Sequence, residues 1–145
     1  ILMNYGGIYL DNDVFVLNPL TEFLKFEMTI AWDEGESIGN QILIASKNAR
    51  FLKLWLKSYK YYDSSRWYYN AGQLPTSSIL ESNPHLVNRV KERFGVSCCG
   101  VINYIFEKNI DLKRWQYNPP EEIYEKDVWL LNTTFGQMAR SVLKI

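Results

Sequence analysis

The sequence predicts an α/β fold, a sheet flanked by helices, and three observations lead to this prediction. The short apolar runs "GIYL", "EMTIAW" and "QILIAS" are rich in β-branched and aromatic residues and are typical of buried strands. The amphipathic stretch that follows, 47–63, is typical of a helix. The chain has 145 residues, of which 47% are hydrophobic, and this length and composition fit one domain over 1–145.

The first half of the chain supplies the predicted strands. Residues 1–5 are expected to form the last turn of a helix that stops at the glycine pair Gly6 and Gly7. Strands are then expected at 7–10, 14–17, 27–32 and 41–46. A polar, acidic loop, "DEGESIGN", separates the last two strands.

The helix predicted over 47–63 should bury one stripe of side chains and expose another. The apolar stripe consists of Leu52, Trp55, Leu56 and Tyr59. The opposing basic stripe consists of Arg50, Lys53, Lys57 and Lys60. Such a stripe could hold a phosphate or face an acidic membrane surface, but the pattern by itself favours a solvated helix face.

The second half is predicted to be helical in two places. A loop is expected over 64–78, because turn-forming residues punctuate it. A second helix is expected over 83–95, from a cap at Asn83 to a stop at Gly95. Its apolar face would comprise Leu86, Val87, Val90 and Phe94. The closing segment, 133–145, is expected to form a short helix.

Charge and hydropathy exclude several classes of function. Sixteen basic side chains balance sixteen acidic ones, which argues against a general nucleic-acid binder because such binding rests on concentrated positive charge. No apolar stretch is long enough to cross a bilayer. The start of the chain, at Ile1, lacks the features of a signal peptide and is expected to be cut from something longer.

The acidic step, by which we mean the tripeptide Asp11-Asn12-Asp13 after the first strand, is the candidate metal site. In an extended strand Asp11 and Asp13 would share one face, while Asn12 would point the other way. Two carboxylates in one small volume repel each other unless a hard divalent cation lies between them, and Mn²⁺ or Mg²⁺ suits that role. The bound cation would then bridge the protein to a diphosphate. The alternative is a polar turn, since an Asp-x-Asp tripeptide is common in loops.

These residues carry a resemblance to a known family. The segment "YGGIYLDNDVFVL" resembles the signature of glycosyltransferases with a DXD-containing sugar-binding region, which include α-1,4-galactosyl- and α-1,4-N-acetylglucosaminyltransferase-like proteins. The resemblance to the animal members of this family extends to the later segments "FEMTIAWDEGESIGNQILIASKNARFLKLWLKSYKYY", "WYYNAG", "HLVNRVKERFGV" and "TTFGQMAR". The resemblance covers most of the chain and identifies it with the C-terminal part of such a catalytic domain.

The resemblance implies a GT-A type, Rossmann-like fold whose N-terminal nucleotide-binding half is missing here. It implies a nucleotide-diphospho-sugar donor, such as a UDP-sugar, a glycan or glycolipid acceptor, and Mn²⁺. It also implies transfer with retention and a location in the Golgi lumen, with a membrane anchor in the missing part. Asp11 and Asp13 would bind the metal, and Asp11 and Asn12 the donor. Gly6, Gly7 and Tyr9 would also line the donor.

The acceptor side of the expected site is less defined. The loop from Asp33 to Gln41 would border the sugar and the acceptor. If transfer inverts configuration, a carboxylate must reach the acceptor hydroxyl, and the candidates are Asp33, Glu34 and Glu36, of which we single out Asp33 and Glu34. The alternatives are a non-catalytic glycan- or divalent-ion-binding module derived from such an enzyme, and a structural domain in which Asp-x-Asp is only a turn.

Overall fold

The computed structural model of the chain describes residues 1–12, 14, 16, 18–91, 93–94, 124–131 and 134–143. The chain divides into two compact units, Ile1–Val96 and Ser97–Ile145, and each is described here by itself. The expectation of one domain over 1–145 stays a prediction.

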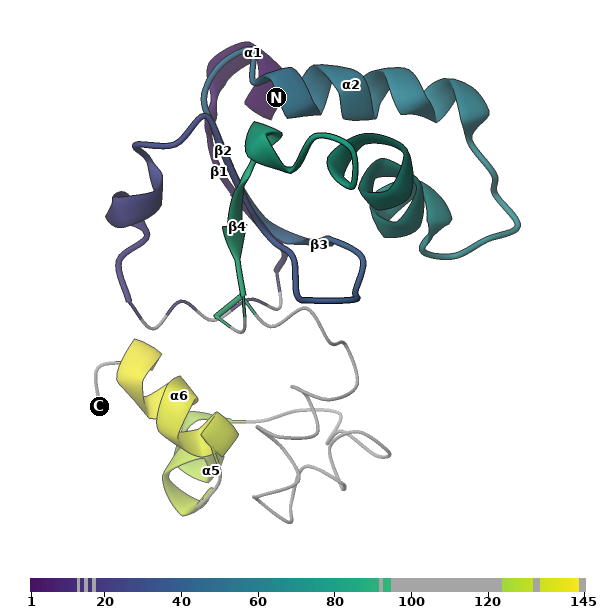
Figure 1. The fold of residues 1–145 in the computed structure, drawn as a ribbon. Coiled ribbons are helices and arrows are strands. Elements are labelled where there is room, and N and C mark those ends of the chain that lie inside the picture. The colour runs from purple at the N-terminus through teal and green to yellow at the C-terminus, as the bar shows by residue number, and fades with distance from the viewer. Residues whose placement is uncertain are drawn as a thin grey trace. The chain divides into compact units, whose positions relative to one another are not determined.

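A four-stranded mixed sheet forms the centre of the first unit (Figure 1). Its strands are β1 (Gly7–Leu10), β2 (Met28–Ala31), β3 (Gly39–Ala45) and β4 (Asn88–Val90). Their order across the sheet is β1-β3-β2-β4. Both β1 and β2 pair antiparallel with β3, whereas β4 pairs parallel with β2. Together with the helices, this sheet confirms the predicted α/β class.

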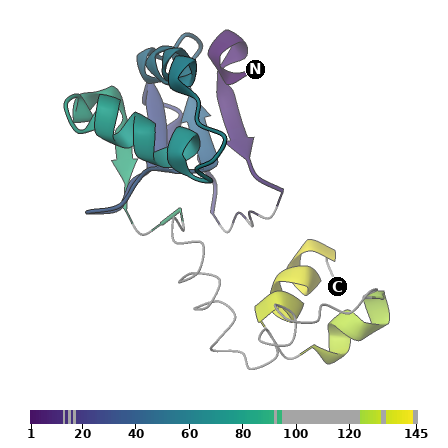
Figure 2. The ribbon, with the colours of Figure 1, turned by 90° about the vertical axis from the view of Figure 1, so that its right-hand side faces the viewer.

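Helices cover one face of this sheet (Figure 2). The α-helices of the first unit are α1 (Leu2–Tyr5) and α2 (Arg50–Ser58). Single turns of 3-10 helix are η1 (Thr21–Phe23), η2 (Tyr59–Tyr61) and η5 (Pro84–Leu86). Two π-helical segments are η3 (Tyr69–Gln73) and η4 (Thr76–Leu80). The predicted helical turn before the glycine pair is thus confirmed as α1.

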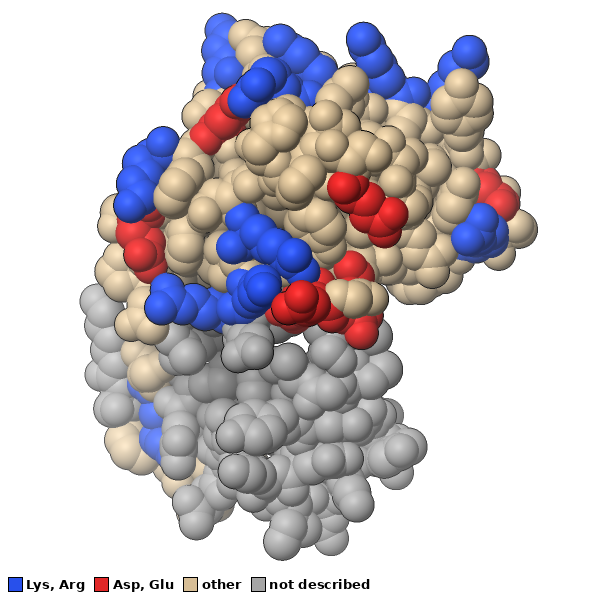
Figure 3. Space-filling view, in the orientation of Figure 1, with Lys and Arg blue, Asp and Glu red and all other residues tan. Residues whose placement is uncertain are grey.

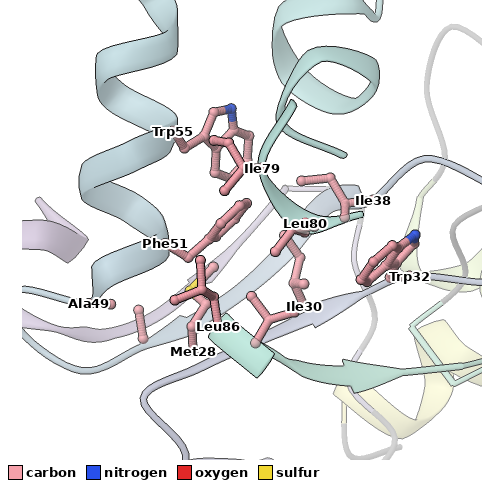
Figure 4. Packing of buried hydrophobic residues seen from close by; sticks show 12 residues of the cluster. Met28, Ile30, Trp32, Ile38, Ala49, Phe51, Trp55, Ile79, Leu80 and Leu86 are labelled. Atoms are coloured by element: carbon pink, nitrogen blue, oxygen red, sulfur yellow. The ribbon is translucent and has the colours of Figure 1, made fainter. Parts of the chain in front are cut away.

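The main core lies between the sheet, α2 and η4 (Figure 4). Phe51 and Trp55 project from α2 toward the sheet, with their ring centroids 5.4 Å apart. They meet strand residues Met28 and Ile30, and Leu80 from η4. A smaller core on the opposite face of the sheet contains Phe23, Ala31, Ile42, Ile44, Val90 and Phe94. Residues of β3 therefore alternate between the two cores, as the period of a strand requires.

The buried stripe of α2 differs from the predicted one. Phe51 and Trp55 are buried, whereas Leu56 is 58% exposed and Tyr59 is 45% exposed. The prediction for Leu56 and Tyr59 was therefore wrong, because spacings of three and four fit more than one line of residues on the same helix. The basic stripe is exposed, as predicted for a solvated face.

The segment 64–78 was predicted to be a loop and is largely helical instead. The Thr76 hydroxyl donates to the carbonyl of Gly72 at 2.7 Å, and the Ser78 hydroxyl donates to that of Leu74 at 2.5 Å. These side-chain bonds to the preceding turn satisfy the hydroxyl groups within the helix, so that they do not bond the backbone in a competing turn. The buried Asn70 side chain also bonds both backbone polar groups of Asp63, at 3.0 and 2.7 Å.

The helix predicted over 83–95 is the largest error in the sequence-based expectations. The chain forms the single turn η5 and then strand β4, whose backbone pairs with β2. The four predicted apolar residues are nevertheless buried, Leu86 and Val87 in the main core and Val90 and Phe94 in the smaller core on the opposite face of the sheet. Pairing with a strand far away in sequence overrode the local helical pattern.

The remaining expectations concern the segment 14–17 and the end of the chain. Val14 and Val16 lie in no strand, so the strand predicted there was wrong for these two residues, and the other two residues lie outside the described part. The second unit contains α5 (Glu125–Leu130) and α6 (Thr134–Leu143), and α6 confirms the predicted closing helix. None of the helices among the described residues is long and apolar enough to cross a membrane.

An ion pair joins β2 to α2 and predicts a pH-dependent contribution to stability. Glu27 accepts the backbone N–H of Arg50 at 2.7 Å and the guanidinium Nη2 at 2.8 Å. These hydrogen bonds lower the pKa of Glu27 below its ordinary value of 4.5. Because the folded-state pKa is lowered, the contribution is complete above pH 4.5 and is lost as the pH falls through the lowered value.

We therefore expect Glu27→Gln to lower the free energy of unfolding by about 0.5 kcal/mol at neutral pH, the usual contribution of an exposed ion pair, because glutamine keeps a hydrogen-bond acceptor but loses the charge. Below the lowered pKa of Glu27 the difference between variant and wild type should vanish, because the protonated wild-type side chain is then uncharged, like the glutamine of the variant. Urea unfolding of both proteins at the two pH values measures this. A difference that stays constant across the range would contradict the assignment to this carboxylate.

Candidate functional site

The carboxyl ends of three strands lie at the same end of the sheet. Because β1 and β2 both run antiparallel to β3, and β4 runs parallel to β2, strands β1, β2 and β4 all point the same way. Asp11, Asp33 and Lys91 follow these three strands, directly or within two residues, and so share this end. Ligands of open α/β sheets bind outside the carboxyl ends of strands. This end is therefore the candidate site.

Asp11 follows β1 directly and is held by a neighbour on the same side of the strand. The Tyr9 hydroxyl donates to Asp11 Oδ1 at 2.5 Å, as expected for residues two apart in extended chain. The backbone N–H of Asp11 donates to the carbonyl of Gln41 in β3 at 2.9 Å. Asp11 is only partly exposed and Tyr9 is exposed, so the carboxylate is accessible at the strand end.

The chain turns immediately after Asp11. The backbone N–H of Val14 donates to the Asp11 carbonyl at 3.2 Å, and Asn12 lies within this turn. The premise of an extended strand through the acidic step was therefore wrong, because strand pairing ends at Leu10. Asp13 lies outside the described residues, so its pairing with Asp11 around a metal stays a prediction.

The glycine pair lies at the opposite end of β1 from Asp11. Gly7 and Asp11 are four positions apart along the strand direction, which corresponds to about 13 Å. Gly6 has φ 71° and packs against the backbone of 45–47, where a Cβ would lie 2.8 Å from the Lys47 nitrogen. The structure thus gives Gly6 a backbone role and does not bring the pair together with Asp11, while around Gly7 there is open space.

The acidic loop after β2 reaches the same end of the sheet as Asp11. It turns at Gly35, which has φ 75°, and the N–H of Glu36 donates to the Asp33 carbonyl at 3.3 Å. Asp33 is partly buried, whereas the Glu34 side chain is 85% exposed and lies 3.3 Å from Lys91. The structure therefore places Asp33 and Glu34 on the candidate site's side of the sheet, at the end of a different strand from Asp11.

Two cations at this end were missed by the sequence analysis. Arg89 donates through Nε to the Trp32 carbonyl at 2.5 Å, and its guanidinium stacks over the Trp32 ring at 4.4 Å. Lys91 pairs with Glu34. Figure 3 shows Lys and Arg side chains beside Asp and Glu side chains where β4 ends. The helix predicted over 83–95 concealed these cations; a strand assignment would have placed both on one face.

Gln41 connects the two sides of the candidate site. Its backbone carbonyl accepts from Asp11, and its side-chain Nε2 donates to the carbonyl of Phe94 at 2.8 Å. Phe94 lies beyond β4, so one residue of β3 links the end of β1 with the chain that follows β4. This bridging fixes the edge of the site near Asp11 without using a charged group.

The part of the chain described by the structure does not complete a metal centre. It contains no group of three His, Cys, Asp or Glu side chains placed to hold one ion. Asp11 contributes one carboxylate, and Mn²⁺ ordinarily takes several oxygen ligands. The metal therefore belongs to the proposal below, in which Asp13 has to supply the second protein ligand.

A shallow cleft lies elsewhere in the first unit. Its volume is about 270 Å³ and its lining includes Glu27, Met28, Arg50, His85 and Asn88. Met28 and Asn88 begin strands β2 and β4, so the cleft lies at the amino ends of the strands, away from Asp11. It is therefore distinct from the site that the sequence predicts.

Comparisons with known proteins give one distant relative. The chain is similar to "Glucan organizing enzyme 1" of Cryptococcus neoformans var. grubii, with 29% identity over 98 residues. The alignment covers 61% of this chain, and the chain spans about a quarter of the relative, 26% of its length. No protein-family model matches the chain. No solved structure matches it either.

Proposed function

We propose that this chain forms the C-terminal part of the catalytic domain of a metal-dependent glycosyltransferase that uses a nucleotide-diphospho-sugar, such as a UDP-sugar. The observation that carries the proposal is the position of Asp11, accessible and hydrogen-bonded by Tyr9 at the carboxyl end of an edge strand. Acidic and basic groups from two other strand ends share that end of the sheet. The similarity to a fungal protein named as an enzyme of glucan organization agrees with sugar chemistry, but it is distant.

The acidic and basic residues of the proposed site would have different roles in the reaction. Asp11 and Asp13 would hold Mn²⁺ or Mg²⁺, which when bound supplies a Lewis acid for the diphosphate. Arg89 and Lys91 would lie near the negative charge that develops on the leaving group. Asp33 and Glu34 would border a glycan or glycolipid acceptor, and in an inverting reaction one of them would take the proton of its hydroxyl. In a retaining reaction the departing diphosphate takes that proton instead.

The proposal predicts coupled binding of metal and nucleotide. Isothermal titration calorimetry of UDP with the whole catalytic domain, of which the proposal makes this chain the C-terminal part, should show binding that strengthens at least about tenfold when Mn²⁺ is present, because the ion bridges carboxylate and diphosphate. In Asp11→Asn the effect of Mn²⁺ on UDP affinity should disappear, and likewise in Asp13→Asn. The matched control is Glu81→Gln, which removes an exposed negative charge outside the site and should leave the coupling unchanged.

Two outcomes separate the proposal from its alternative. If UDP binds equally with and without Mn²⁺ in the wild-type catalytic domain, the metal-dependent transferase is ruled out for these residues. The alternative is a non-catalytic glycan- or divalent-ion-binding module. It predicts binding on a glycan array that survives replacement of both aspartates, while UDP shows no coupled binding.

A further inference from the structure

A concentration of positive charge lies along α2 and the turn that follows it. The range 47–62 contains five Lys or Arg residues and no Asp or Glu, in a chain whose charges balance overall. All five are exposed: Lys47, Arg50, Lys53, Lys57 and Lys60. Figure 3 shows Lys and Arg side chains projecting in a row over α2. Arg50 is neutralised by Glu27, which leaves four lysines to define the charge of this surface.

Large apolar and aromatic side chains are exposed between and beside these lysines. Leu56 is 58% exposed and Tyr61 is 66% exposed, and both lie between or next to lysines in the sequence. Trp67, in the connection that follows, is 97% exposed. Within 47–67 the exposed large apolar and aromatic residues are Leu54, Leu56, Tyr59, Tyr61, Tyr62 and Trp67. We call these residues and the four lysines the α2 surface.

This combination exceeds what a solvated helix face requires. A helix that only faces water needs its cations, but gains nothing from exposing leucine and tyrosine beside them. Lysines interleaved with leucine and aromatic residues are typical of helices that lie on a membrane, where aromatic rings occupy the headgroup layer. The nearby acid Asp63 stays ionised, because the hydrogen bonds from the Ser65 hydroxyl and N–H, at 2.6 and 2.9 Å, lower its pKa, but its single negative charge does not balance four lysines.

We propose that the α2 surface docks on a membrane that contains anionic lipids. The lysines would contact lipid phosphates and carboxylates, while Leu56, Tyr61 and Trp67 would enter the interface between headgroups and acyl chains. The core of the unit is not involved, because Phe51 and Trp55 point from the other side of α2 into the protein. The proposal concerns peripheral binding and is independent of the proposed enzymatic site, which lies at the strand ends.

Vesicle flotation of the 145-residue chain tests the proposal. Binding should be weak to phosphatidylcholine vesicles and should rise at least about tenfold when about 30% phosphatidylserine is included, and it should fall at high salt. Lys57→Glu with Lys60→Glu should reduce binding to the anionic vesicles to the background level. Tyr61→Ser with Trp67→Ser should weaken binding at low and at high salt, since it removes the apolar contacts.

A matched control makes the same change in net charge outside the α2 surface. Lys25→Glu with Lys126→Glu alters net charge by the same amount at two exposed lysines outside the α2 surface, and it should leave vesicle binding unchanged. Equal loss of binding in both double variants would overturn the proposal, because net charge would then explain it. Retention on heparin without binding to anionic vesicles would also overturn it, by indicating an acidic glycan as the partner. Circular dichroism verifies that each variant is folded.

Discussion

Replacement of Phe51 by alanine should destabilise the first unit by about 3–5 kcal/mol. The Phe51 side chain is fully buried in α2 between Trp55 and the sheet residues of the main core (Figure 4). Removing the ring loses its transfer free energy and leaves a cavity that the surrounding strands fill only in part. Since a unit of this size is stable by only about 5–15 kcal/mol, thermal unfolding should shift down by roughly 15–30 °C.

The control for this prediction is on the same helix. Leu56→Ala removes an aliphatic side chain that is 58% exposed, so it should change the free energy of unfolding by less than about 0.5 kcal/mol. The two variants together test which face of α2 is buried. A large effect of Leu56→Ala with a small effect of Phe51→Ala would contradict the structure and restore the stripe predicted from the sequence.

Gly6→Ala should destabilise the unit by about 2–4 kcal/mol. Gly6 has φ 71° and ψ −169°, a conformation that essentially only glycine adopts. A Cβ at this position would also lie 2.8 Å from the Lys47 nitrogen and 2.9 Å from the Ala45 oxygen. Both contacts are backbone atoms at the end of β3, so relief requires a shift of the pairing between β1 and β3. Urea unfolding monitored by circular dichroism measures the loss.

Gly35→Ala separates backbone strain from steric contact. Gly35 has φ 75°, close to that of Gly6, but a Cβ there would meet no atom within 4 Å. We expect it to cost about 1 kcal/mol, the strain of a positive φ alone. If both variants cost the same, the close approach of Gly6 to β3 does not contribute.

The contrast between α2 and β4 explains how much of the fold could be predicted. The strands around Ile30 and Leu43 and the helix around Trp55 were located correctly, because apolar periodicity there agrees with the local backbone preference. The segment around Arg89 carries helix-like signals, with Asn83 and Pro84 before it. It became a strand because β2 offers a parallel partner that no local pattern reveals.

The candidate site was likewise predictable from the sequence only in part. The sequence could predict that Asp11 follows a strand, since glycine and β-branched residues precede it. It could not show that the chain turns directly after Asp11, or that Arg89 and Lys91 lie at the same end of the sheet as Asp33 and Glu34. The second relation depends on the pairing of β2 with β4, which brings together residues 57 positions apart, such as Glu34 and Lys91.

By itself the sequence determined the α/β class, the positions of three strands and of helices α1, α2 and α6, and the acid at the end of β1. These follow from side-chain periodicity and turn residues, which act over a few neighbouring positions. Only the tertiary structure decided which face of α2 is buried, that β4 is a strand, and which cations accompany the acidic loop. The physical reason is that long-range pairing and core packing select among local patterns of similar free energy.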